Sequence, residues 1–458
     1  MILCMRCCLK VLINIAFLLA FSQHLTAQNG HFVGSPEGEM ANSIFQYNNY
    51  FFIVGTIRST PQSSTDGYIL QLNFNGNVKK DIVIGGAHGD VAKDIIVNDN
   101  GIFVLGKTWD GGFPNNDMVL TRLEFNGKIK WKKYYGGNHN DFGHKMSETR
   151  DGGFIMAGFN RSVDDFGNAY LVKTNGGGEV IWEKNFGGIY VDHGFDVLEN
   201  SKNEIVMVGT LGGFYNPTST DFLNHDADIL IVKTDENGNE IWSKTYGGEG
   251  HDWPKSIIAT PDNGYFICGS TQSEGVGSFD LFLMKIDEDG NQLWFNTYGG
   301  VDWEYGETVQ MSVDRKLFLL GTSASFSDNY NPDHFLVKTD LNGEVIWSET
   351  FGGINSDYSS GAVCTADSGC VFTGWTNNGI QGKKDIVFYK IAKDGTAESI
   401  SGLKPLNDSI EQITVFPNPV INNFSVLIDS RLESEFQIKL YNLKGEILYE
   451  DTILANIA

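Results

Sequence analysis

Seven carboxylates recur along the chain at one position of a regular spacing. Each stands five residues after the first glycine of a Gly-Gly pair, or after Gly34, which takes that place in the first case. They are Glu39, Asp90, Asp141, Asp192, Asp252, Glu304 and Asp357. Carboxylate oxygens coordinate hard cations such as Ca²⁺, and they also accept backbone N–H bonds that fix turns. The series therefore predicts either seven structural turns or a cation site. Three nearby histidines, His88, His139 and His251, are too scattered for a zinc site.

Aromatic and acidic residues form a second set with binding chemistry. Four tryptophans stand within two residues of Asp, Asn or Glu: Trp109, Trp253, Trp303 and Trp375. Tyr215, Asp221, His225 and Asp226 stand in a segment, residues 211–227, where the repeat described below is longer by about eight residues. Tryptophan rings stack on the apolar faces of sugars, while carboxylates bind the hydroxyls. The alternative is that these tryptophans cover the edge of a core.

Catalytic motifs are weak in this sequence. We find no HExxH helix, phosphate-binding loop, dinucleotide fingerprint or nucleophile elbow. A glycosidase needs two carboxylates placed across one glycosidic bond, and the regular acids do not single out such a pair. We therefore assign no catalytic residue.

A repeat explains where these residues fall. An acidic or amide residue opens an apolar run, and a glycine follows ten residues later, at Asp66/Gly76, Asp117/Gly127, Asn168/Gly178, Asp228/Gly238, Asp280/Gly290, Asp333/Gly343 and Asp385/Gly395. Successive glycines are 51, 51, 60, 52, 53 and 52 residues apart. A period near 50 with several short strands per unit is typical of a β-propeller. The sequence predicts an all-β fold, a seven-bladed β-propeller of four-stranded blades within residues 28–401.

Each unit contains four strand-like segments. In the second unit these are residues 90–97, 101–108, 117–123 and 128–135, from the innermost strand to the outermost. The second segments are the most apolar, as expected where neighbouring blades cover both faces. Tryptophans recur five residues before the glycine pairs and predict packing between blades: Trp131, Trp182, Trp242, Trp294 and Trp347. Residues 31–33 would pair with the last blade and close the ring.

The ring would gather the candidate residues on one face. The seven acids begin the innermost strands, so they would surround one mouth of a central channel. The loops between second and third strands project from the same face, and binding residues are concentrated on such loops. The four tryptophans of the second set lie near this face in four different blades.

Composition and charge exclude some partners. The 458-residue chain carries a formal net charge of −24, which disfavours nucleic acid and anionic membranes. Cationic ligands, Ca²⁺ and neutral glycans remain candidates. The 41% hydrophobic content is sufficient for a large core.

The first 27 residues predict a secretory signal. Arg6 and Lys10 precede a mostly apolar run, residues 11–21, that is too short to span a membrane, and no later segment reaches transmembrane length. We expect a secreted or outer-membrane-surface protein. Cys364 and Cys370 flank a turn, and they would be either a disulfide or two free thiols.

The tail differs from the repeat. After a polar linker, residues 402–412, come the segments Pro417-Asn418-Pro419 and Tyr441-Asn442-Leu443-Lys444-Gly445. This pairing, over about 45 residues, resembles the C-terminal sorting domain of the Bacteroidetes type IX secretion system. The resemblance implies a small Ig-like β-sandwich in residues 413–458 that engages the secretion machinery. The family's Gly-x-Tyr segment and basic last residues are not found before Ala458, so the module resembles an incomplete one.

The repeat units also resemble a known group. Their pattern, clearest in residues 151–188 with Asp151-Gly152-Gly153-Phe154, is similar to that of secreted bacterial propeller proteins with no common activity. We interpret the chain as an exported binding or interaction protein that uses its loop face, with a glycan as candidate ligand. The alternatives are a polysaccharide-degrading glycoside hydrolase with loop-face carboxylates and a structural or adhesive surface protein.

Overall fold

The computed structural model describes residues 31–33, 38–58, 65–86, 88–109, 116–163, 166–212, 226–327, 331–353, 355–377 and 384–398, and four strands beyond them. The described residues form strands and turns and contain no helix. A search of them for a helix able to cross a membrane therefore finds none. Tyr215, Asp221 and His225 lie outside the described residues.

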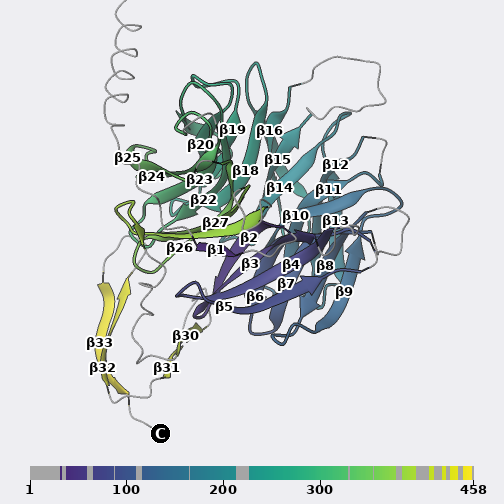
Figure 1. Ribbon diagram of the computed structural model, residues 1–458. Helices are drawn as coiled ribbons and strands as arrows, with labels where there is room; N and C mark the ends of the chain where they lie inside the picture. Colours follow the sequence, from purple (N-terminus) through teal and green to yellow (C-terminus); the bar gives the residue numbers. More distant parts are fainter. Residues whose placement is uncertain are drawn as a thin grey trace, which may run out of the picture.

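Seven antiparallel sheets are arranged around a centre (Figure 1). The inner strands are β2 (Glu39–Tyr47), β6 (Asp90–Asn98), β10 (Asp141–Glu148), β14 (His193–Glu199), β18 (Asp252–Ala259), β22 (Glu304–Met311) and β26 (Asp357–Cys364). Each contacts the next one along the chain, and β26 contacts β2. The fold is therefore a closed seven-bladed propeller, as the repeat predicted.

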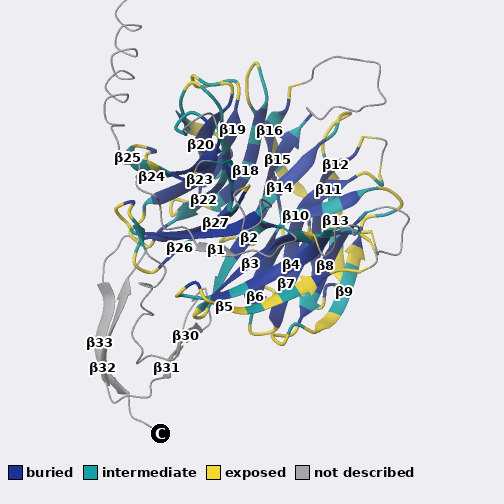
Figure 2. Cartoon of the chain, viewed as in Figure 1, coloured by how far each residue is buried: buried dark blue, intermediate teal, exposed yellow. Residues whose placement is uncertain are grey.

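The second and third strands of each blade follow in order. The second strands are β3 (Tyr50–Arg58), β7 (Gly101–Thr108), β11 (Phe154–Asn160), β15 (Ile205–Leu211), β19 (Tyr265–Thr271), β23 (Leu317–Ser323) and β27 (Cys370–Thr376). The third strands are β4 (Thr65–Asn73), β8 (Asp117–Leu123), β12 (Asn168–Thr174), β16 (Asp228–Thr234), β20 (Asp280–Ile286), β24 (Asp333–Thr339) and β28 (Asp385–Ile391). They supply most of the buried surface (Figure 2).

Outer strands complete the blades. Blades one to six end in β5 (Val78–Ile84), β9 (Ile129–Tyr135), β13 (Val180–Phe186), β17 (Glu240–Tyr246), β21 (Gln292–Tyr298) and β25 (Val345–Phe351). Exposed and half-buried residues dominate them, as β9 shows in Figure 2. The observed strands of blade two match the predicted segments to within one residue at each end.

The seventh blade is completed from both ends of the ring. β1 (His31–Val33) pairs with β28, with His31 opposite Phe388 and Val33 opposite Ile386. β29 (Ala397–Glu398) pairs with the other end of β28, where Ala397 lies opposite Ile391. The predicted closure through residues 31–33 is confirmed.

The core lies between blades rather than within them. Seven hydrophobic clusters each combine side chains of two adjacent blades, and one of them joins Phe51 of the first blade to Phe388 of the last. Burial of this apolar surface is the main stabilising term. Each blade supplies half of two clusters, one on each side, and without its neighbours it would expose both halves to water. We therefore expect the ring to be stable only as a whole.

The recurring tryptophans pack between blades, as predicted. A Cβ added to Gly178, which has a φ of +78°, would lie 2.8 Å from Cη2 of Trp131 in the preceding blade. The same relation joins Gly238 to Trp182, and in blade six Gly343 to Trp294. The positive φ and the close ring both require glycine there.

Cys364 and Cys370 lie directly opposite each other in the β26–β27 hairpin, where the sequence placed them. Both are free thiols, so the disulfide alternative is not formed in this structure. Burial raises the pKa of the Cys364 thiol to about 12. Because the thiolate is the reactive form, this burial disfavours oxidation.

Beyond the ring, the tail forms two antiparallel hairpins. They are β30 (Gln412–Phe416) with β31 (Ser425–Asp429), and β32 (Ser434–Tyr441) with β33 (Ile447–Ala455). The residues Pro417, Asn418, Pro419, Leu443 and Gly445 of the sorting motif lie outside the described residues.

Candidate binding face and central channel

The seven acids, which we call the ring acids, are buried in the turns between blades. Each is 5% exposed or less. In six blades the carboxylate accepts the backbone N–H of the second glycine, four residues earlier, at 2.6–3.1 Å. The second oxygen is also engaged: in Asp192 it accepts the N–H of Gly212 at 2.7 Å, and in Glu304 the hydroxyl of Ser323 at 2.7 Å.

A second carboxylate lies beside several ring acids and explains why the first residue of the pair is glycine. A Cβ on Gly352 would lie 1.9 Å from Oδ1 of Asp333 and 2.7 Å from Oδ2 of Asp357. Gly299 is enclosed in the same way by Asp280 and Glu304. Burial raises the pKa of both Glu304 and Asp357.

This geometry favours the structural interpretation of the ring acids over a cation site. Their oxygens are directed at backbone N–H groups and hydroxyls rather than into the channel. In the part of the chain that the structure describes, no group of three or more His, Cys, Asp or Glu side chains is placed to hold a metal ion.

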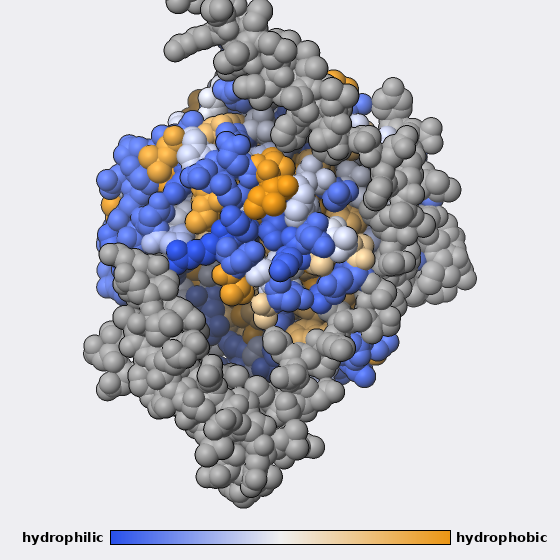
Figure 3. Space-filling model, turned by 90° about the vertical axis from the view of Figure 1, so that its left-hand side faces the viewer, coloured by the Kyte–Doolittle hydropathy of each residue, from blue (hydrophilic) through white to orange (hydrophobic). Residues whose placement is uncertain are grey.

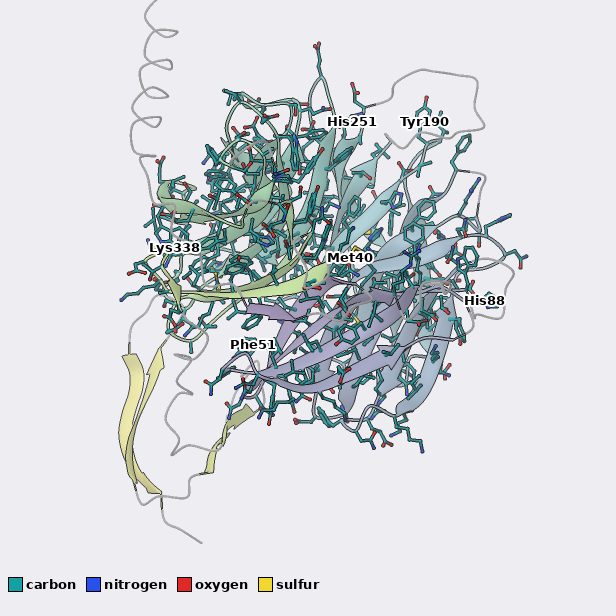
Figure 4. All side chains as sticks on the ribbon, viewed as in Figure 1. Met40, Phe51, His88, Tyr190, His251 and Lys338 are labelled. Carbon is teal, nitrogen blue, oxygen red and sulfur yellow. The ribbon has the colours of Figure 1, made fainter. Side chains whose placement is uncertain are left out.

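The residues that follow the ring acids line the channel. Along each inner strand the ring acid and the second residue after it are buried, while the first and third residues after it are partly exposed in nearly every blade. In Figure 4, Met40, the first residue after Glu39, lies near the middle of the molecule, and His88, Tyr190 and His251 of the turns before three inner strands lie toward one side. That side carries the ring acids, and we call it the loop face.

Every inner strand has a β-bulge at the same place. The register shifts between the second and the fourth residue after the ring acid in all seven blades, for example between Gly143 and Lys145. The extra residue of each bulge is Asn42, Lys93, His144, Phe195, Lys255, Glu307 or Ser360. A bulge bends the strand and re-aims its side chains. Here it gives the channel a ring of residues that differ from blade to blade.

Aromatic rings occupy the first position after the ring acid in five successive blades. These residues, which we call the aromatic arc, are Phe142, His193, Trp253, Tyr305 and Tyr358. Ring centroids are 5.7 Å apart for Phe142 and His193, and 6.4 Å apart for the stacked Trp253 and Tyr305. The channel mouth on the loop face is therefore largely aromatic.

Three of the four tryptophans proposed from the sequence join this arc. Trp303 contacts Tyr305 with ring centroids 4.8 Å apart, and Trp253 stacks on Phe279 at 4.9 Å. Trp375 stacks on Tyr358 at 4.3 Å. Trp253, Trp303 and Trp375 are all half-buried, so part of each ring stays accessible.

Trp109 does not share these contacts. It is 57% exposed and lies at the end of the second strand of blade two, where its backbone N–H donates to Gly89. Asp226 is exposed on the same face, at the end of the loop whose other proposed residues are not described. The structure therefore joins Trp253 to Trp303 through Tyr305 and stacks Trp375 on Tyr358 of the next blade, and it does not join Trp109 to them.

Basic residues gather in the channel below the arc. The ammonium of Lys255 lies 4.6 Å from the centroid of Phe195, and that of Lys107 lies 5.8 Å from Phe142. Nε2 of His144 is 3.4 Å from Nδ1 of His193. Burial lowers the pKa of His193 to about 3, with a further contribution from Lys255, so this imidazole is neutral at pH 7.

The deeper channel wall is internally neutralised. Lys145 donates to Oδ1 of Asp94 at 3.0 Å and to the hydroxyl of Ser43 at 2.9 Å, which connects three blades. Asp196 accepts the backbone N–H groups of Val197 and Ile257. Burial raises the pKa of Asp196 to about 6.

Other surfaces carry less binding chemistry. The side of the molecule on the left of Figure 1 is mostly hydrophilic, with hydrophobic residues in separate patches (Figure 3). A pocket of about 370 Å³ lies between the outer strands β13 and β17, and Phe186, Leu211 and Lys244 are among its lining residues. It lies at the outer strands of blades three and four rather than along the inner strands that carry the channel-lining positions. The loop face with its channel is therefore the candidate site.

Comparisons with known proteins agree with the fold. The chain is similar to a polysaccharide lyase, an ulvan lyase solved bound to -[GlcA(1-4)Rha3S]-, with 12% identity and a TM-score of 0.52 over 82% of this chain and 97% of that one. It is also similar to the WD40 domain of Neurospora crassa Pan2, with 10% identity and a TM-score of 0.50 over 80% and 97% of the two chains. No protein-family model and no curated protein matches the chain. At these identities the likeness shows the propeller fold alone.

Proposed function

We propose that this protein is a secreted or cell-surface binding protein that recognises a glycan on its loop face. The observation that carries the proposal is the aromatic arc with Trp303 and Trp375 beside it. All rings of the arc except the buried His193 are half-buried, and such stacked rings present apolar faces at low entropic cost, which suits the apolar faces of sugar rings. Polar groups for the hydroxyls stand on the same face, among them the phenol of Tyr358 at the mouth and the exposed Asp226 before the third strand of blade four.

Binding is a better supported role than hydrolysis. A glycoside hydrolase needs two accessible carboxylates about 5 or 9 Å apart. The seven ring acids are buried, and six of them accept hydrogen bonds from the second glycine of the preceding pair, so they do not offer that pair of accessible carboxylates. The printed activity of the ulvan lyase belongs to that protein, since the likeness is one of fold.

A glycan array tests the proposal, with release of reducing ends followed in the same wells. We expect binding without release. Trp303→Ala and Trp375→Ala should each weaken binding about tenfold, since a stacked ring contributes roughly 1–2 kcal/mol. Val313→Ser on a hairpin turn of another face is the matched control and should bind as the parent does.

Trp109→Ala decides whether the binding surface extends to blade two. Release of reducing ends would instead support the hydrolase alternative. Absence of binding to every glycan on the array would contradict glycan binding and favour the structural or adhesive role.

Export through the type IX secretion system is the second part of the proposal. Its support is the sorting-type sequence with Pro417, Asn418, Pro419, Tyr441, Leu443 and Gly445, together with the signal-like first 27 residues. Expression of the full chain in a Bacteroidetes host tests it. The propeller should reach the medium or the outer surface, and replacement of Tyr441 and Gly445 should retain it in the periplasm. Export that is unchanged in that variant would contradict a sorting role for the tail.

A further inference from the structure

We propose that the central channel binds the anionic substituents, carboxylate or sulfate, of an acidic saccharide through Lys93, Lys107 and Lys255. This proposal rests on the proposed glycan-binding function and names the class of its ligand. We call these three residues the channel lysines. The argument depends on their position, their lack of ion-pair partners and the rings that surround them.

The channel lysines converge from different blades. Lys93 and Lys255 are the bulge residues of β6 in blade two and β18 in blade five, nearly opposite each other around the ring. Lys107 lies on β7, opposite Val91, which is the first residue after Asp90. Lys255 and Lys107 each lower the pKa of Lys93 by repulsion, after the larger effect of burial. The three charges are therefore directed toward the same central region, from the inner strands of blades two and five and from β7.

The described residues give these lysines no ion-pair partner within 4.0 Å. Buried lysines elsewhere in the described residues do have such partners: Lys173 with Asp151, Lys233 with Glu204 and Lys390 with Asp367. The channel lysines are half-buried, and a charge that is partly removed from water without a counterion is costly and is retained mainly at functional positions. An anionic ligand would supply the missing countercharge.

Other charged groups in the channel do not neutralise the channel lysines. Glu307, the bulge residue of blade six, attracts Lys93 and Lys255, and its own pKa is raised by burial. Asp94 and Lys145 bond to each other, and Asp196 accepts two backbone N–H groups. Three lysines thus face two carboxylates that have no ion-pair partner, Glu307 and Asp196, in a chain whose overall charge is −24.

The surroundings suit a saccharide better than a free inorganic anion. Lys255 and Lys107 rest on the faces of Phe195 and Phe142, which stabilises the ammonium groups without using their N–H donors in an ion pair. At the mouth, Lys384 lies 3.8 Å from the centroid of Trp375. Cations thus alternate with stacking surfaces from the mouth into the channel, which matches a chain of sugar rings that carries charged substituents.

Oligosaccharides of matched length test the proposal by calorimetry on the full chain. The probes are hexagalacturonate for carboxylate, a sulfated dextran oligosaccharide for sulfate, maltohexaose as the neutral sugar, and sodium sulfate alone. We expect an acidic oligosaccharide to bind at least tenfold more tightly than maltohexaose, with an affinity that falls as salt increases. The better of the two acidic probes identifies the substituent.

Variants locate the site. Lys93→Gln and Lys255→Gln should each weaken binding of the acidic probe about tenfold and leave maltohexaose unaffected. Both should fold with an unchanged or higher Tm, because no ion pair is lost and repulsion is relieved. Lys130→Gln, on the exposed outer strand β9, makes the same change of charge away from the channel and should bind as the parent does.

The outcomes separate this proposal from the proposed function. If neutral and acidic sugars bind equally and the lysine variants match Lys130→Gln, the channel proposal is wrong and glycan binding stands. If sulfate raises the Tm of the parent but not of Lys93→Gln, while no sugar binds, the channel holds anions and glycan recognition is wrong. If neither sulfate nor the acidic oligosaccharides bind, the channel proposal fails.

Discussion

Closure of the ring by β1 can be tested by replacing residues 31–33 with Gly-Pro-Gly in the full chain. The proline removes a backbone donor and the glycines disfavour extended structure, so the pairing with β28 should be lost. Three residue pairs join β1 to β28, and about three hydrogen bonds at about 1 kcal/mol each give a loss of roughly 3 kcal/mol. The first and last blades would then be held together by side-chain packing and the short β29.

The expected shift in melting temperature follows from the size of the ring. At about 2.1 cal/mol/K per residue, a ring of roughly 370 residues unfolds with an entropy of about 0.8 kcal/mol/K. A loss of 3 kcal/mol therefore lowers the Tm by about 4 °C, measurable by scanning calorimetry. Amide exchange of residues 386–388 should also accelerate, because these residues lie opposite β1.

The second strand that pairs with β28, β29, supplies the comparison. Ala397→Pro disrupts β29, which pairs with only two residues of β28, and should cost less than the change in β1. A Tm that stays within 1 °C after the β1 change, with a larger drop for Ala397→Pro, would mean that closure depends on β29. That result would refute the reasoning from register.

Three further predictions concern the turns and the buried imidazoles. Gly352→Ala should lower the free energy of unfolding by more than 2 kcal/mol in urea titrations, because its Cβ would meet two carboxylates. Gly353→Ala is the control, because a Cβ there meets nothing within 4 Å. Burial lowers the pKa of His334 to about 3. The stability that depends on its neutral imidazole is therefore complete above the unfolded value near 6.5 and is lost as the pH falls toward 3. The free energy of unfolding should decrease between pH 7 and pH 4, and a His334→Asn variant should show a smaller decrease. Calcium or EDTA should shift the Tm by less than 1 °C if the ring acids are structural. A rise of several degrees with calcium would instead support a cation site at the ring acids.

The number of blades and the limits of their strands could be predicted because the residues that fix them recur. Glycines with positive φ, such as Gly178, the ring acids and the packing tryptophans each have one geometric role, which recurs in all blades for the ring acids and in five of the seven blades for the tryptophans. Residues with such roles can be recognised in the sequence because they recur at the same position of the repeat. Cross-strand placement of Cys364 and Cys370 followed from the same hairpin pattern, although their oxidation state did not.

The channel could not be predicted in the same way. Its lining residues change type from blade to blade, as Lys93, His144 and Phe195 do at one equivalent position, so comparison of the repeats hides them. The bulges depend on pairing with the second strand, which composition does not show. A search along each inner strand for the first and third residues after the ring acid would have found the site.

The shared bulge has a consequence for how such a molecule can change. Its frame is specified by the acid and the small residue two places later, for example Ala41, Gly143 or Gly306. The lining positions, the first and third residues after the acid, lie outside this frame and are partly exposed in nearly every blade. Substitution at these lining positions should therefore alter the chemistry of the passage with little effect on the ring. The lining of one propeller can therefore be changed one blade at a time to suit a new ligand. A designed library should vary the same positions.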